Sequence, residues 1–451
     1  MTLPHCDQVQ AAWGGTLSLG LGATEAWTLA TAVLCAVGCG VVGCFLVLRR
    51  LSLLGDAISH AVLPGLAAAF LITQSRGTIP MLAGALVVGL LTGFLAAGLG
   101  RWGRVSEDSS LGVVFSSLFA LGVLMVTWVA RDVDLDPGCV LYGLIEFVPF
   151  DRVNVAGLDV PRSLVGIGVM LLFSVTLIVV FFKELRITAF DPALATTMGI
   201  SAAAMHYGLM GVVAATTVVS FEAVGSILVV AMLVAPGAAA QLMSDRLHRM
   251  LWIAAGVAAL AAALGYGAAL ALNTSVAGMI ATASLVLYVL AALVAPAHGW
   301  LPKLGRRYAL SLRIAREDLL GLLYRRHEAA LATGGATEPL AEADAWRAVG
   351  GGVVARLATR GLRVAGLVDA GREGLVATAA GLGRAREVIR GHRLWESYLA
   401  RNLPLPADHL HEPAHRAEHF LTPQAMEALG EMTPEAVDPH GKRIPPAGGG
   451  G

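Results

Sequence analysis

Hydrophobic residues gather in long runs along the first 300 positions of this chain, and short polar segments separate the runs. A window of about 19 residues finds nine runs that are long enough to cross a bilayer as helices. They lie near residues 27–48, 54–72, 79–100, 109–130, 163–183, 202–220, 224–243, 250–272 and 276–296. This pattern predicts an all-α polytopic membrane domain of about nine transmembrane helices. A tenth apolar segment, residues 141–150, is shorter and is typical of a re-entrant or interfacial stretch.

The pattern changes after residue 300 to that of a water-soluble domain. Residues 317–325 have apolar positions at helical spacing, and residues 353–361 resemble a helix that ends in glycine. Residues 362–378 alternate around Asp369, which predicts a two-stranded wing, so a winged helix is expected. We expect five parts: an extracytoplasmic segment 1–26, a transmembrane domain 27–300, a linker 301–315, a cytoplasmic winged-helix and helical domain 316–446, and a disordered tail 447–451.

Composition agrees with this division. The chain is 56% hydrophobic and 14% charged, with a mean hydropathy of +0.70, which is far too apolar for a soluble protein of 451 residues. Residues 1–300 hold 12 of the 32 Lys and Arg and 15 of the 32 Asp and Glu, so charge is concentrated in the last third. The net charge of zero provides no basic field for nucleic acid, and the five cysteines form no Cys-x-x-Cys pair, which excludes a zinc knuckle or redox motif.

Basic clusters recur after every second predicted span. They follow spans 1, 3, 5, 7 and 9 and comprise Arg49, Arg50, Arg101, Arg104, Lys183, Arg186, Arg246, Arg249, Lys303, Arg306 and Arg307. The intervening loops are acidic or short, as at residues 131–136. The positive-inside rule therefore predicts an N-terminus outside the cell and a cytoplasmic C-terminal domain.

Ionisable residues inside the spans are few, and Asp56 and His60 are the clearest pair. Four positions apart on a helix, the carboxylate and imidazole share one face about 6 Å apart, a geometry that suits Mn, Fe or Zn. A simple hydrogen bond that neutralises both groups is the alternative. His206 and Glu222 are further intramembrane candidates, although both lie near predicted span ends, where an interfacial position is equally reasonable.

Two stretches, SLLGDAISHAVLPG at residues 52–65 and FEAVGSILVVAMLVAPGAAAQLMSDRL at residues 221–247, closely resemble the permeases of ABC importers for zinc, manganese and iron. The resemblance covers roughly residues 25–300 and implies that Asp56 and His60 lie on the translocation path, with both permease subunits contributing. It further implies a location in the cytoplasmic membrane, a second permease subunit, an external metal-delivering solute-binding protein and a separate ATPase. No Gly-x-x-x-x-Gly-Lys-[Ser/Thr] motif is present in this sequence, so we expect a transporter subunit that is not itself an enzyme, with no organic cofactor.

The segment FDPALATTMGI at residues 190–200 looks like the coupling segment that docks on the ATPase in these importers. Asp191 is a plausible N-cap, Pro192 suits the first helical position, and Gly199 suits a left-handed C-terminal cap. An ordinary capped connector is the alternative reading.

The C-terminal domain contains a second set of metal-ligand residue types. His392 and Glu396 are spaced as helical neighbours, as are His411 and His415, and Glu418 and His419 follow within one turn. Such side chains suit one or two divalent metals, with a solvated histidine-rich helix as the alternative.

These segments, with residues 438–445, resemble the iron- and manganese-dependent regulators of the diphtheria-toxin-repressor type over about residues 316–446. The resemblance implies one site from His392, Glu396 and His411. It implies another from His415, Glu418 and His419, with Asp318 as a first-helix ligand. The sequence departs from the family at Gly321, where a second first-helix carboxylate is expected, and His415 stands where Cys or Glu is usual.

DNA binding by this domain is doubtful, because residues 346–357, taken as the recognition helix, include three consecutive glycines and few base-reading side chains. Three functions remain: a metal-importing ABC permease with a regulatory metal-sensing tail, a membrane-anchored metal-dependent regulator, and an ATP-independent carrier. The coupling-like segment favours the first. Manganese or iron is the expected cargo, with zinc as the alternative.

Overall fold

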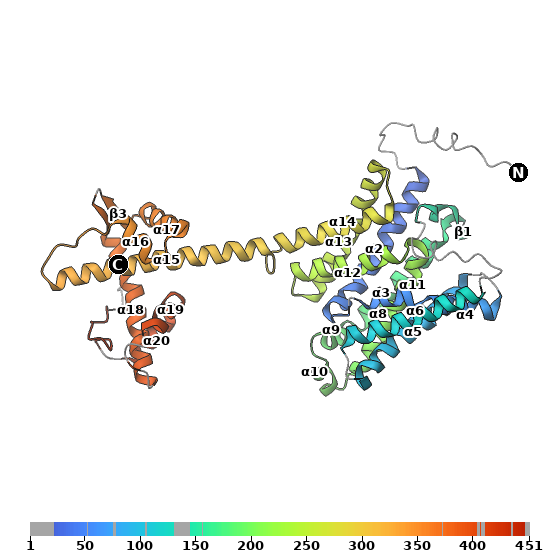
Figure 1. Cartoon of the computed structure of the whole chain (residues 1–451), viewed down its shortest axis with the longest axis horizontal. Coiled ribbons are helices and arrows are strands. Elements are labelled where there is room, and N and C mark those ends of the chain that lie inside the picture. Colours follow the sequence, from blue (N-terminus) through green and yellow to red (C-terminus); the bar gives the residue numbers. More distant parts are fainter. Residues whose placement is uncertain are drawn as a thin grey trace. The chain divides into compact units, whose positions relative to one another are not determined.

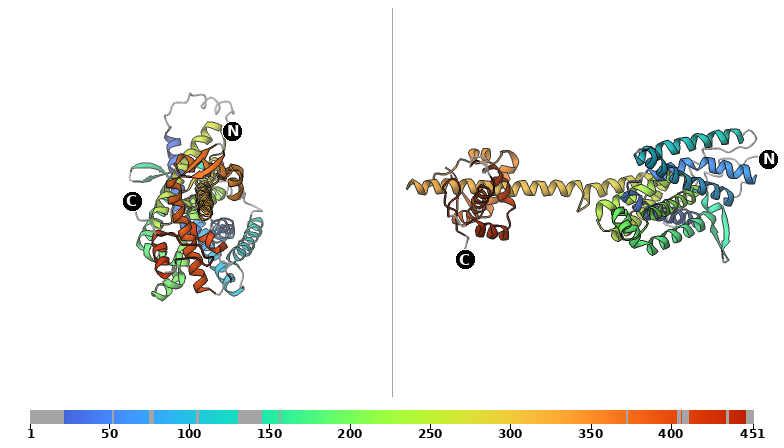
Figure 2. Two further views of the ribbon diagram at one scale, coloured as in Figure 1. Left: turned by 90° about the vertical axis from the view of Figure 1, so that its left-hand side faces the viewer. Right: turned by 90° about the horizontal axis from the view of Figure 1, so that it is seen from below.

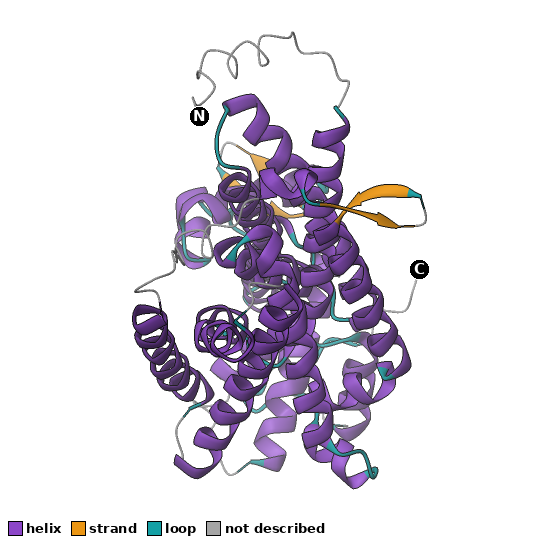
Figure 3. Cartoon of the chain, turned by 90° about the vertical axis from the view of Figure 1, so that its right-hand side faces the viewer, coloured by secondary structure: helices purple, strands orange, loops and turns teal. Residues whose placement is uncertain are grey.

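The structure is a computed structural model, and it describes residues 22–51, 53–74, 78–103, 106–129, 145–155, 157–371, 373–403, 406, 411–433 and 436–446. The chain divides into two compact units, residues 1–302 and 303–451. Both units are mainly helical, and the strands of the described residues form two antiparallel hairpins (Figures 1 and 3). The expected segments 1–26 and 447–451 lie largely or wholly outside the described residues.

The first unit contains the apolar helices. In chain order its elements are α2 (Ala23–Leu48), α3 (Leu54–Ala61), α4 (Leu63–Thr73), α5 (Thr78–Gly103), α6 (Glu107–Val129), η1 (Ile145–Phe150), β1 (Arg152–Val155), β2 (Leu158–Pro161), α8 (Arg162–Val180), α9 (Phe182–Phe190), α10 (Pro192–Thr197), α11 (Ala202–Val224), α12 (Ser226–Met243), α13 (Leu247–Leu272) and α14 (Val276–Val294). Within the described residues, nine candidate membrane spans are present, which confirms the predicted helical membrane domain.

Two local backbone features within the predicted spans were not expected from the hydrophobic pattern. The second span is broken into α3 and α4 at Val62, because Pro64 has no N–H to continue the helical ladder. The sixth span continues to Val224 and is separated from the seventh by Gly225 alone, whose φ of 81° breaks the helix.

Glycines allow several of these helices to approach closely. A Cβ on Gly43 of α2 would lie 1.8 Å from the carbonyl oxygen of Leu233 in α12, and one on Gly65 of α4 would lie 2.3 Å from the carbonyl oxygen of Gly84 in α5. Without a hydrophobic driving force between helices in lipid, such backbone contact is a main source of packing energy. In α3, the helix that carries Asp56, a Cβ on Gly55 would lie 2.7 Å from Leu233 Cδ1, so this helix is closely packed as well.

The second unit has its own core. Its elements are α15 (Trp300–Ala332, which begins in the first unit), α16 (Glu342–Ala348), α17 (Gly352–Val364), β3 (Val368–Gly371), β4 (Gly374–Ala377), α18 (Ala379–Asn402), α19 (His411–Ala417), η3 (Glu418–Phe420) and α20 (Pro423–Met432). Leu319 and Leu323 of α15 pack with Leu362 of α17 and Leu375 of β4, which gives the predicted winged-helix arrangement. Residues 301–315, expected as a linker, are part of α15, which is one uninterrupted helix (Figure 2).

The expected recognition helix at residues 346–357 is instead parts of two helices. Gly350, Gly351 and Gly352 all have positive φ, from 70° to 87°, and they turn the chain between α16 and α17. These three residues adopt left-handed backbone, which interrupts the helix after α16. The next helix, α17, starts at the last of them, Gly352. Likewise, the wing occupies 368–377, since residues 362–364 still belong to α17.

Candidate metal sites

Asp56 and His60 lie together in α3, within a candidate membrane span. His60 Nε2 is 3.5 Å from Asp56 Oδ1, and both side chains are partly accessible, at 32% and 42% respectively. The ring of Phe119 meets the His60 ring edge to face at 5.8 Å. The sequence spacing therefore gives the expected shared face, with room for a further ligand.

A cavity of about 110 Å³ adjoins His60 of this pair, and Asp56 is not among its lining residues. His60 and Ser59 line it from α3, Phe119 and Thr127 from α6, and Phe221 from α11. The other residues that line the cavity are apolar, so His60 is the side chain in its wall that is best suited to bind a metal. Two protein ligands are fewer than a bound divalent cation usually takes, which is consistent with a site that is shared or transient.

The two weaker intramembrane candidates lie at opposite ends of α11. His206 is in its first turn, where its Nδ1 lies 3.3 Å from Arg49 Nη1, and Glu222 is in its last turn and is exposed. Neither residue lines the cavity beside His60.

The coupling-like segment has the predicted capped geometry. Asp191 Oδ1 accepts a hydrogen bond from Leu194 N at 2.9 Å, Pro192 is the first residue of α10, and Gly199 has a φ of 81°. Phe190, Leu194 and Met198, spaced by four, are 61%, 51% and 61% exposed. The short helix and the residues on either side of it therefore expose three apolar side chains: Phe190 ends α9, Leu194 lies in α10 and Met198 follows α10.

In the C-terminal unit, four predicted ligands from three elements meet. The ligand atoms of Asp318 (α15), His415 (α19), Glu418 and His419 (η3) all lie within 4.8 Å of one another. We call these four residues the first tail site. It is the single group of three or more such residues found in the described part of the chain.

The ligand atoms of the first tail site lie close together without satisfying one another's hydrogen bonds, as expected for ligands of a shared cation. Asp318 Oδ1 and His419 Nε2 are buried 3.2 Å apart, yet within the described residues neither has a hydrogen-bond partner. Buried polar atoms that converge without hydrogen bonding are expected where a further group completes them. Two imidazoles and two carboxylates would hold Mn, Fe or Zn, and the bound ion would supply the positive charge that this acidic cluster lacks.

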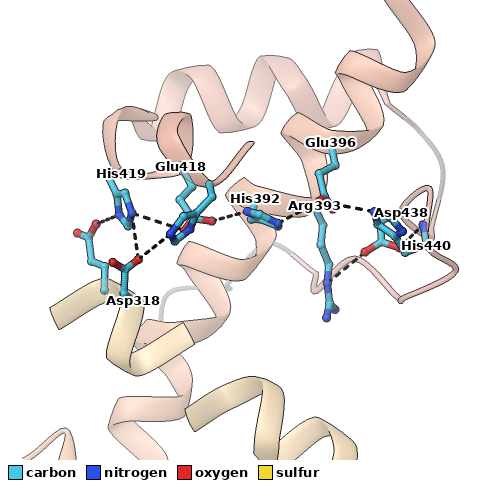
Figure 4. A network of polar contacts seen from close by, with 10 residues as sticks. Asp318, His392, Arg393, Glu396, Glu418, His419, Asp438 and His440 are labelled. Carbon is cyan, nitrogen blue, oxygen red and sulfur yellow. Dashed lines mark hydrogen bonds and ion pairs between the residues drawn. The ribbon is translucent and has the colours of Figure 1, made fainter. Parts of the chain in front are cut away.

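Glu418 connects this site to the second pair of predicted ligands (Figure 4). One carboxylate oxygen lies 2.9 Å from His415 Nδ1, and the other lies 2.6 Å from His392 Nδ1. His392 Nε2 in turn lies 3.1 Å from Glu396 Oε1. We call His392 and Glu396, both on α18, the second tail site. His411 begins α19, but its side chain lies outside the described part of the chain.

The carboxylates strongly favour positive charge at both sites. Burial lowers the pKa of His419, but the adjacent carboxylates of Asp318 and Glu317 outweigh that effect and raise the pKa to about 9. Burial likewise lowers the pKa of His392, and Glu396 and Glu418 outweigh that effect, again raising the pKa to about 9. The cluster is thus electrostatically suited to a cation.

Sequence reasoning missed two neighbours of these sites. Glu317 Oε2 lies 2.8 Å from His419 Nδ1, on the opposite side of the ring from Asp318, so it orients a ligand. His440 belongs to residues 438–445, a segment that resembles the iron- and manganese-dependent regulators. Its Nε2 lies 3.9 Å from Glu396 Oε1. At Gly321, the sequence departs from the family pattern. A Cβ added at this position would lie 3.6 Å from the side chain of Ile389 in α18, so Gly321 packs against that helix.

A buried arginine holds the second tail site in place. Arg393 donates to both oxygens of Glu328 of α15 at 3.0 and 2.6 Å, and its Nε lies 3.5 Å from Asp438 Oδ2. Asp438 Oδ1 accepts from the amides of His440 and Lys442. We call Glu328, Arg393 and Asp438 the clamp, because they join α15, α18 and the C-terminal loop.

The first unit is thus a polytopic helical bundle with an Asp–His pair in a candidate membrane span, and the second unit carries a cluster of metal-ligand side chains. Comparison with known proteins identifies the family. The ABC 3 transport family matches residues 24–295, and the chain belongs to that family. The iron dependent repressor, metal binding and dimerisation domain matches residues 378–446.

Relatives match about three fifths of the chain. The manganese transport system membrane protein MntD of Bacillus subtilis is 46% identical over 280 residues, which is 62% of this chain and 95% of the relative. The zinc transport system membrane protein TroD of Treponema pallidum is 37% identical over 288 residues, 64% of this chain and 77% of the relative. Among solved structures, PsaBC from Streptococcus pneumoniae in complex with Fab matches with a TM-score of 0.53 and 30% identity, over 62% of this chain and 95% of that one.

Proposed function

We propose that this chain is the permease through which a divalent metal cation, manganese in the first place, is imported with energy from a separate ABC ATPase. The observation that carries the proposal is the Asp56–His60 pair, which lies within a membrane span of an ABC 3 family chain and beside a cavity. The names of the relatives favour manganese and keep zinc as the alternative.

The chemistry of the pair supports transport more than tight binding. A carboxylate and a neutral imidazole accept Mn, Fe or Zn, but two ligands leave most coordination positions to water or to other groups. Residues of a second permease subunit would supply the others, and the cation would be released again readily. His60 next to the cavity is where we place the passing ion.

Coupling to the ATPase would occur at α10. Asp191 and Pro192 fix its start and Gly199 its end, and we expect the ATPase to cover the exposed apolar side chains of Phe190, Leu194 and Met198 in and beside α10. Burying such side chains on association is favourable by about 25 cal/mol per Å² of apolar area. A solute-binding protein on the other side of the membrane would deliver the metal.

The basic loops support the orientation of the chain. Spans 1, 3, 5, 7 and 9 are each followed by Lys or Arg clusters, so we place those loops, α10 and the C-terminal unit in the cytoplasm.

The C-terminal unit would then sense the imported metal and regulate uptake. Its first tail site takes Asp318 from α15 and its other ligands from α19 and η3, so a bound cation would hold these elements together. The exposed positions of α17 carry Val353, Leu357 and Val364 together with Arg356, Arg360 and Arg363. The proposed gating role therefore rests on the metal-ligand cluster of the tail.

Transport in vesicles that contain the chain, its ATPase and its solute-binding protein tests the proposal. With Asp56→Ala or His60→Ala, we expect uptake of Mn²⁺ to fall at least tenfold while the ATPase remains bound. Asp245→Ala and His298→Ala are the matched controls, because that Asp–His pair, 3.8 Å apart, lies outside the spans. Full uptake in the Asp56 variant would refute the pathway, and uptake without the ATPase would favour a secondary carrier. Competition between Mn²⁺, Fe²⁺ and Zn²⁺ identifies the cargo.

Regulation is tested in the same vesicles with metal enclosed on the tail side. Asp318→Ala and His419→Ala should change the dependence of uptake on that internal metal. His327→Ala is a matched control, since this histidine instead contacts Thr337 at 2.8 Å. The same response in wild type, both site variants and a chain ending at Pro302 would exclude gating by the tail.

A further inference from the structure

A short turn joins the end of α2 to α3, the helix that carries the Asp56–His60 pair. Arg49 caps the end of α2. Two residues later, the N–H of Leu51 donates to a carbonyl of α2 at 2.8 Å, and the carbonyl of Leu51 accepts from the first residue of α3 at 3.0 Å. Leu51 is also buried. Because the turn is short and bonded to both helices, a displacement at Arg49 would be transmitted to α3.

The guanidinium of Arg49 reaches two other helices. Its Nη2 donates to Thr188 Oγ1 of α9 at 2.8 Å, and its Nη1 lies 3.3 Å from His206 Nδ1 of α11. Thr188 is buried, so its hydrogen bond to the guanidinium is shielded from water. Hydrogen bonds from an ionised donor are stronger than those between neutral groups. Arg49 therefore joins α2 firmly to α9.

Helix α9 continues directly into the coupling-like segment. Asp191 ends α9, where its N–H donates to Ile187 O at 2.8 Å, and it also begins α10, where its carboxylate accepts from Leu194 N at 2.9 Å. Thr188 lies in the last turn of α9, three residues before Asp191. An unbroken series of contacts therefore runs from α10 through Thr188 and Arg49 to α3.

Two buried polar atoms at this junction lack a hydrogen-bond partner among the described residues. They are Arg49 Nε and Glu184 Oε2. Glu184 lies on α9, four residues before Thr188, so both side chains occupy one face of that helix. A buried carboxylate oxygen without a partner is costly, and a guanidinium can bind a carboxylate through two donors. A shift of α9 by about one turn, roughly 5 Å, would bring Glu184 to Arg49 in place of Thr188.

We propose that Arg49 is a positioning residue through which movement of α10 reaches the Asp56–His60 pair. Its guanidinium exchanges Thr188 for Glu184 as the transporter changes state. This inference rests on the proposed function, because it takes α10 as the place where the ATPase acts. A fixed tie between α2 and α9 is the competing explanation. It gives no role to the unpaired carboxylate of Glu184, whereas a packed junction with two arrangements does.

The ratio of Mn²⁺ transported to ATP hydrolysed tests the proposal in vesicles that contain the chain, its ATPase and its solute-binding protein. Glu184→Gln removes the second partner but no contact that Arg49 makes in this structure, so a fixed tie predicts no change. The exchange predicts that the ratio falls about tenfold, the scale of a coupling free energy between two sites, while the ATPase stays bound. Arg49→Gln should lower the ratio similarly. Arg186→Gln, at an exposed position of α9, is the matched control and should leave it unchanged.

Reversing the pair gives a readout that a structural role would not move. Arg49→Glu with Glu184→Arg should restore much of the ratio that each single substitution removes, because the ion pair can form again in the opposite sense.

An unchanged ratio in Glu184→Gln, or a reversed pair that is no better than the single variants, would overturn the exchange. Wild-type uptake that needs no ATPase would instead refute the proposed function, and this inference with it. Coupled uptake in wild type together with unaffected variants refutes the inference alone.

Discussion

Replacing Glu328 by Gln should loosen the clamp that holds α15, α18 and the C-terminal loop together. Arg393 is 4% exposed and is bound to Glu328 through two short contacts. Breaking a buried ion pair by removing one partner typically costs about 3–5 kcal/mol. Glu328 is itself 34% exposed and Asp438 remains near Arg393, so we expect about 2 kcal/mol here.

Hydrogen exchange on the full chain measures this loss where it occurs. The amides of His440 and Lys442 are held by Asp438, and a loss of about 2 kcal/mol corresponds to exchange about 30-fold faster. Glu427→Gln, at an exposed position of α20, is the control. Unchanged exchange in the Glu328 variant would refute the reasoning, because it would mean that the arginine is held without this carboxylate.

The pH dependence of the clamp has a definite sign. The hydrogen bond from Arg393 lowers the pKa of Glu328 from 4.5, so its folded-state pKa is below its unfolded value. The contribution is therefore complete above pH 4.5 and is lost as pH falls through the lowered pKa. The Gln variant should lose this acid sensitivity, and exchange of the C-terminal loop measured from neutral pH downward checks it.

Three further substitutions probe other levels of the structure. Gly43→Ala should destabilise the membrane unit by about 2 kcal/mol through overpacking, measured as a lower Tm in detergent, whereas Gly98→Ala should be neutral because its Cβ meets nothing within 4 Å. Gly199→Ala should strain the end of α10 by about 1 kcal/mol and weaken stimulation of the ATPase by transport, while Gly208→Ala should not. Glu418→Gln should weaken divalent metal binding by the tail roughly 10- to 100-fold in equilibrium dialysis, and an unchanged affinity would contradict the geometry of both tail sites.

Much of the fold was predictable because hydrophobic length and periodicity are local properties. The predicted spans are confirmed by the nine candidate helices of the described residues, and the capped helix at Asp191 is confirmed because caps depend on a few neighbouring residues. The helix breaks that the hydrophobic pattern did not predict had local causes whose strength depends on context. Pro64 interrupts a helix at Val62, and Gly225 ends one span directly before the next.

The candidate sites were predictable to a different degree. Asp56 and His60 share one helix, so spacing alone sets their separation. Glu317 and His440 could not be inferred in this way, because they reach His419 and Glu396 from distant parts of the chain. The roles of all these residues in transport and sensing stay predictions.

By itself, the sequence determined the membrane class, the number of spans in the described residues, the intramembrane Asp–His pair and the residue types of the tail sites, because each depends on composition or on helical spacing. The tertiary structure decided what spacing cannot express. It placed the carboxylate of Glu418 between His392 and His415, brought Asp318 to His419, and locked α18 to α15 through Arg393. These contacts join residues far apart in the chain, so their distances follow from the packing of whole helices.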